Sequence, residues 1–243
     1  MSERELRKAE GALHHAYREV TLAHLRLDDL RRGVSTASTA LTEAELHARG
    51  QNPESWIEAV APEDLSRVGR LCDSAALVGV DIASHLKVAS EAIEDARQVL
   101  GRIDRRDLEG PDVANLAALE ARTAAVGEVV DLALPMATAA SENLYSAAHG
   151  MGSGRALDSY AAGSEPVPAV TFGSLSLVNN NLGRAEADGR HLGKAVDRAE
   201  ASIAQVATEA ECVTADARAR LGHSLIQHQA PSQAEISFEG PVR

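Results

Sequence analysis

The chain carries nine histidines, the side chains with the widest capacity for metal binding and proton transfer near neutral pH. Helical bundles that hold paired metal ions use Glu-x-x-His motifs on inward helix faces. None of the nine histidines follows a glutamate by three residues, and the nearest match is Asp188 before His191. No His-x-x-x-His pair occurs, and the adjacent His14 and His15 point to different faces of a helix. We therefore interpret the histidines as surface residues and predict neither a metal site nor a cofactor.

Two further groups of residues could carry chemistry, and neither has the pattern that the chemistry requires. Residues Gly189 to Lys194 read GRHLGK, with three residues between the glycines where a phosphate-binding loop has four, and no serine or threonine follows. Cys72 and Cys212 lie at or beside regularly spaced apolar positions, so we interpret both as small buried hydrophobic residues. The sequence therefore predicts a chain that is not an enzyme, without catalytic residues or an evident small-molecule substrate.

Apolar residues that recur at alternating intervals of three and four identify the elements that would position these side chains. Four such runs occur, over 6–44, 65–103, 116–147 and 175–217. This spacing is typical of helices that pack along a continuous contact line. Many of the positions are alanine or glycine, which let two backbones approach closely. We predict helices over about 3–48, 63–107, 112–148 and 174–228.

The predicted fold class is all-α: an elongated bundle of four long, mostly antiparallel helices with Ala-rich heptad seams. We expect one domain over 1–228, with a flexible loop at 150–173 and a polar C-terminal tail at 229–243. Short connections between the first three helices imply antiparallel neighbours. The longer loop before the fourth helix leaves three interpretations open, namely a crossover, a hinge or a binding loop.

Some residues next to these runs bear on how the helices pack. Leu22, Leu25 and Leu46 flank the first run and are expected to widen its buried stripe against two neighbouring helices. Pro135 lies inside the third run, where it removes a backbone hydrogen bond and is expected to kink the helix. The segments 129–140 and 166–183 are poor in charge, and we interpret them as core in preference to an exposed apolar tip.

Charge and composition limit the classes of partner and location. The formal net charge of −12 argues against nucleic acid, because binding to phosphates requires a basic surface. The first residues lack the apolar core of a signal peptide, and no run is long and apolar enough to predict a transmembrane helix. Two cysteines are too few for a disulfide framework. We expect a cytoplasmic protein, with leaderless export left open.

Three functions are compatible with this pattern. The favoured hypothesis is a non-enzymatic helical scaffold that binds a protein partner or self-assembles, with aromatic and aliphatic anchors at Trp56, Ile57, Phe172 and Phe238. The alternative is a membrane-active bundle; chain length, helix number and the two charge-poor segments resemble those of helical pore-forming proteins. The third hypothesis is a sensor or enzyme with a ligand or metal in the bundle core, which the Ala-rich seams disfavour because they leave few inward polar residues.

Overall fold

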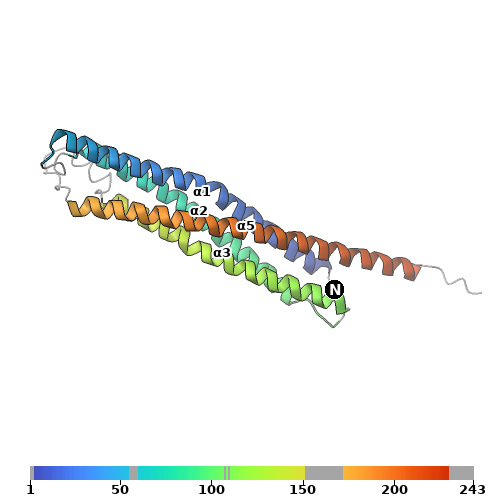
Figure 1. Ribbon diagram of the computed structural model, residues 1–243. Helices are drawn as coiled ribbons and strands as arrows, with labels where there is room; N and C mark the ends of the chain where they lie inside the picture. The colour runs from blue at the N-terminus through green and yellow to red at the C-terminus, as the bar shows by residue number, and fades with distance from the viewer. Residues whose placement is uncertain (1–2, 55–59, 107, 109, 151–171, 230–243) are drawn as a thin grey trace, which may run out of the picture.

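The computed structural model describes residues 3–54, 60–106, 108, 110–150 and 172–229, with side chains in the last segment from 175 to 220. These residues form four helices, α1 (Glu3–Gln51), α2 (Pro62–Gly101), α3 (Gly110–Gly150) and α5 (Phe172–Gln229). No strand occurs within the described ranges. At a rise of 1.5 Å per residue the helices are about 60 to 87 Å long, so the molecule is a rod (Figure 1).

The four helices surround one core, and each packs against two others. Helices α1 and α3 each lie between α2 and α5, which places α1 diagonally opposite α3. Neighbouring helices run in opposite directions. Glu19 of α1 contacts His85 of α2, whereas Glu43, further along α1, contacts Arg67, which comes before His85 in α2. The bundle therefore has up-down-up-down order, and the predicted fold class is confirmed (Figure 1).

The predicted contact lines form the core. All the predicted core positions of α1, α2 and α3 that lie in these helices are buried, as are those of α5 except Val213. Val213 is half-buried, and the neighbouring Thr214 is buried in its place. The Thr214 hydroxyl donates a hydrogen bond to the carbonyl of Ala210 at 2.8 Å, so its polar atom is satisfied within its own helix.

The core is narrower than the sequence suggested. Leu25 and Leu46, which we expected to extend the buried stripe of α1, are 66% and 63% exposed, so that prediction was wrong. Leu22 is half-buried. Leu25 and Leu46 each follow a buried alanine, Ala23 or Ala44, by two residues, which rotates them about 200° around the helix onto the face away from the core.

Glycines mark the closest approaches between helices. A methyl group on Gly33 of α1 would lie 2.8 Å from the Cβ of Ala75 on α2. A methyl group on Gly79 of α2 would collide with the Ser141 hydroxyl of α3. The absence of a side chain at these two positions lets the backbones pack at short range.

Two helix features differ from or extend the prediction. Helix α2 ends at Gly101, six residues before the predicted end at 107. There the amide of Arg102 donates to the Val99 carbonyl at 3.2 Å, a three-residue bond that tightens and closes the last turn. Helix α3 continues through Pro135, whose side chain is exposed; the kink itself stays a prediction.

Candidate functional site

The predicted partner anchors fall where the structure gives no side-chain description. Trp56, Ile57 and Phe238 lie outside the described residues, and so do most of the 150–173 loop and the tail after Gln229. Phe172 is the first residue of α5, without a described side chain. Their role as anchors stays a prediction.

The line of contact between α1 and α5, which we call the α1–α5 seam, holds two other candidate sites. These helices are the first and last of the described bundle, so no single connection joins one directly to the other. Arg218 of α5 donates to Glu3 of α1 at 3.1 Å near one end of the seam. The guanidinium groups of Arg7 and Arg218 lower the pKa of the Glu3 carboxyl group.

The first candidate site is a groove of about 520 Å³ on this seam. Leu30 and Val34 of α1 and Ala185 of α5 give it an apolar floor. Gly189 of α5 also lines it, and a Cβ at Gly189 would meet no atom within 4 Å. The groove therefore offers apolar surface and free volume where the two helices leave a gap. Its size is within the range of ligand-binding clefts.

Hydroxyl groups follow the α1 wall of the groove. The Thr42 hydroxyl donates to the Ser38 carbonyl at 3.0 Å, as is usual for threonine within a helix. The hydroxyls of Ser35, Ser38 and Thr39 make no hydrogen bond to any other described residue. These three hydroxyls, free of hydrogen bonds to the described residues, can donate to or accept from a bound molecule.

Charged residues stand at the ends of the groove. Arg31 donates to Asp28 at 3.2 Å, and its guanidinium lies over Gly193 of α5. Arg190 is paired with Glu186 on α5 at 2.5 Å. Glu43 lies at the other end of the α1 wall, 3.6 Å from Arg67 of α2. Acids and bases thus both line the groove, so it has no strong preference for one net sign of charge, although Arg31 and Glu43 lie toward opposite ends of its α1 wall.

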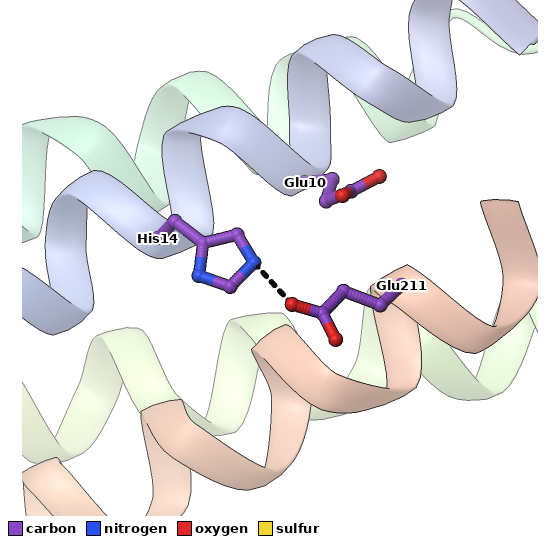
Figure 2. Close-up of side chains that lie close together, drawn as sticks. All are labelled: Glu10, His14 and Glu211. Carbon is purple, nitrogen blue, oxygen red and sulfur yellow. Dashed lines mark ion pairs between the residues drawn. The ribbon is translucent and has the colours of Figure 1, made fainter.

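The second candidate site is a histidine–carboxylate cluster nearer the start of α1. Glu10 and His14 extend from α1, and Glu211 extends toward them from α5 (Figure 2). The His14 Nε2 atom lies 2.8 Å from a Glu211 carboxylate oxygen. One potential ligand atom from each of the three residues lies within 4.8 Å of the other two. The side chains of His14 and Glu211 are about half exposed, so solvent ions can reach them.

Other histidines also meet acids from a neighbouring helix. His24 of α1 lies 2.5 Å from Glu200 of α5, and Glu200 also accepts a hydrogen bond from Thr21 at 2.9 Å. His85 of α2 lies 2.8 Å from Glu19 of α1. Local spacing could not reveal these pairs, because the partners are separated by 66 to 176 residues in the chain.

The two cysteines differ in their environment. Cys72 is buried, and this burial, with a smaller contribution from the charge of Asp73, raises the pKa of its thiol to about 12. Cys212, which we expected to be buried, is exposed. The inward line of α5 passes through Ala210 and Thr214, which leaves residue 212 on the outer face. Both thiols are free, so neither is in a disulfide.

Polar groups in the described core are few and mostly bonded within their own helix. The buried polar side chains are Ser66, Thr123, Ser141, Asn181 and Thr214. Thr123 donates to the Leu119 carbonyl at 2.7 Å, and Ser141 donates to the Ala137 carbonyl at 2.9 Å. The described core therefore offers few polar side chains to a ligand, and both candidate sites lie outside it, on the α1–α5 seam.

Comparisons of the chain with protein-family models, curated proteins and solved structures find no match.

Proposed function

We propose that the chain is a non-enzymatic helical scaffold that binds an amphipathic helix, from a protein partner or from a second copy, in the groove of the α1–α5 seam. The observation that carries this proposal is the groove itself, with an apolar floor and three free hydroxyls on a rod whose described core is filled by apolar side chains.

The dimensions of the groove favour a helix as the bound element. Its lining on α1 extends from Leu30 to Glu43, which corresponds to about 20 Å of helix axis. An amphipathic helix binds such a groove through apolar side chains at intervals of three and four residues. Small residues on the lining, among them Ser35, Ala185 and Gly189, allow a third backbone to approach closely.

Charges at the groove ends would set the direction of the bound helix. Arg31 stands at one end of the α1 wall and Glu43 at the other. A partner helix with acidic residues near Arg31 and basic residues near Glu43 would be complementary to this arrangement. Exposed charges of this kind contribute more to orientation and association rate than to affinity.

A substitution that fills the groove without disturbing the fold tests the proposal. Gly189→Trp places a large side chain in the open volume, because a Cβ at this position meets nothing within 4 Å. Gly183→Trp is the control for a bulky side chain on the same helix, since a Cβ at the exposed Gly183 also meets no atom within 4 Å and this residue does not line the groove. Light scattering after size-exclusion chromatography measures self-association, and cross-linking in cell extract with tagged protein measures partner binding.

The proposal predicts that Gly189→Trp abolishes an association that both the wild-type protein and Gly183→Trp retain. Circular dichroism should show the same helix content for all three proteins. An association that persists in Gly189→Trp, or a wild-type protein that is monomeric and captures no partner, would contradict the proposal.

One observation supports a membrane-active bundle as a second candidate function. Helix α3 contains a window with a mean hydropathy of 1.2 of which 33% is buried, and its Leu132 is 63% exposed. A single such helix also occurs in soluble bundles, so length and composition alone do not decide between them. Leakage of dye from anionic vesicles tests this function directly: leakage would favour it over the scaffold, and the absence of leakage and of lipid co-sedimentation would eliminate it.

A further inference from the structure

The cluster of Glu10, His14 and Glu211 differs from the other charged contacts of the bundle in its balance of charge. Glu3, Glu209 and Asp112 each pair with an arginine on a neighbouring helix. Glu10 has no ion pair with any described arginine or lysine, and the described ion-pair partner of Glu211 is His14. Two carboxylates thus face a single imidazole, which leaves a local excess of negative charge for a cation to neutralise.

The positions of the three side chains suit a metal ion. Glu10 and His14 are four residues apart on α1, which places them one turn apart on the same helix face. Glu211 approaches from α5, and Figure 2 shows His14 and Glu211 pointing toward each other between the two helices, with Glu10 beside them on α1. Bonds of about 2.0 to 2.2 Å to nitrogen and oxygen require ligand atoms roughly 3 to 3.6 Å apart. The three ligand atoms lie within 4.8 Å of one another, so a bound ion would have to draw them together by roughly 1–2 Å.

The donor set indicates the class of metal. One imidazole nitrogen with two carboxylate oxygens suits divalent first-row transition metals, whereas calcium and magnesium prefer oxygen alone. Three protein ligands also leave coordination positions for water, as solvent-exposed sites do.

We infer that Glu10, His14 and Glu211 form a binding site for a divalent first-row transition metal ion, with zinc as the probe, that joins α1 to α5. A metal bond here would close the bundle between its first and last described helices, which are far apart in sequence. Ligands on segments so distant in the chain couple metal binding to the folded arrangement. A bound ion would therefore link α1 to α5 and stabilise the folded bundle, and its site is separate from the groove.

His24 supplies a matched control on the same seam. Like His14, it projects from α1 toward a glutamate of α5, with His24 Nδ1 lying 2.5 Å from Glu200. Its second acid, Asp197, lies 3.8 Å away, and these residues do not form a three-ligand cluster within the described part of the chain. His24→Ala therefore removes a comparable histidine without removing the proposed ligands.

Isothermal titration of the full chain with zinc chloride tests the inference. We expect one equivalent to bind to the wild-type protein and to His24→Ala, with at least a tenfold loss of affinity in His14→Ala and in Glu211→Gln. Zinc should raise the melting temperature of the first two proteins and leave that of the last two unchanged. Cobalt in place of zinc gives a d–d absorption spectrum that reports the ligand environment, and this spectrum should be lost in His14→Ala.

Glu211→Gln preserves the size of the side chain, so it keeps the experiment informative if His14→Ala alters folding. Equal zinc affinity in His14→Ala and His24→Ala, or the absence of one-to-one binding in the wild-type protein, would overturn the inference. Loss of binding in both histidine variants would also count against it, because the ion would then be held by scattered surface histidines.

Discussion

Replacing Gly33 by alanine tests how closely α1 and α2 approach. A methyl group at this position would lie 2.8 Å from the Cβ of Ala75, which is shorter than carbon atoms tolerate. Ala75 has no flexible end that could move aside, so the two backbones must separate. Gly11 on the same helix is the control, because a Cβ there meets no atom within 4 Å.

Two opposing effects determine how much each substitution changes the free energy of unfolding. Alanine is favoured over glycine inside a helix by about 0.5–1 kcal/mol, and this gain applies at both positions. Overpacking in a close-packed interior costs about 1–3 kcal/mol, and this cost applies only at Gly33. We therefore expect Gly33→Ala to lower the free energy of unfolding by up to about 2.5 kcal/mol and Gly11→Ala to raise it by about 0.5–1 kcal/mol.

Urea unfolding followed by circular dichroism measures both changes. A double-mutant cycle with Ala75→Gly assigns the cost to the contact, because removing the Ala75 methyl should relieve the strain of Gly33→Ala. We expect a favourable coupling of about 1 kcal/mol or more between the two substitutions. Stabilisation by Gly33→Ala equal to that by Gly11→Ala would show that α1 and α2 do not approach this closely.

Further predictions follow from burial. Leu27→Ala should lower the free energy of unfolding by about 2–5 kcal/mol, since Leu27 is buried, whereas Leu25→Ala should change it by less than about 0.5 kcal/mol in the same urea assay. Thiol labelling at pH 8 should modify the exposed Cys212 at once and Cys72 only on unfolding, because burial raises the pKa of the Cys72 thiol to about 12; rapid labelling of two thiols in native protein would contradict this. Thr123→Val should be nearly neutral, because the Thr123 hydroxyl is bonded within its own helix; a loss above about 2 kcal/mol would show that this hydroxyl has another role.

The fold could be predicted because the core depends on a regular local pattern. Residues such as Leu13, Ile82 and Val196 recur at helical spacing, and burial of that stripe requires long helices packed side by side. The short connections between the first three helices further implied antiparallel neighbours. The predictions for Leu25 and Cys212 were wrong because each lies two residues from a buried position of its own helix, Ala23 or Ala210, and so points away from the core; strict helical spacing applied to each residue would have predicted their exposure.

The candidate sites could not be predicted from the sequence for a related reason. The sequence shows that Glu10 and His14 lie one turn apart on the same helix. Glu211 lies close to them only because of the way α5 is aligned along α1. The groove is likewise lined by small residues of two distant segments, including Ser38 of α1 and Gly189 of α5. A site formed by residues of two helices depends on how those helices are aligned along each other in the folded chain. The apolar pattern of the sequence describes each helix separately.

Both sites require α1 and α5 to lie side by side in one antiparallel register, and cysteine cross-linking measures this most directly. In a chain carrying Cys72→Ala and Cys212→Ala, the pair Thr21→Cys and Glu200→Cys replaces two side chains that are hydrogen bonded at 2.9 Å. The pair Thr21→Cys and Glu211→Cys is displaced by roughly 16 Å along the helix axis. A short thiol cross-linker should join the first pair within one chain and leave the second unlinked. Equal linking of both pairs, or linking of the second alone, would contradict the arrangement on which the groove and the metal site depend.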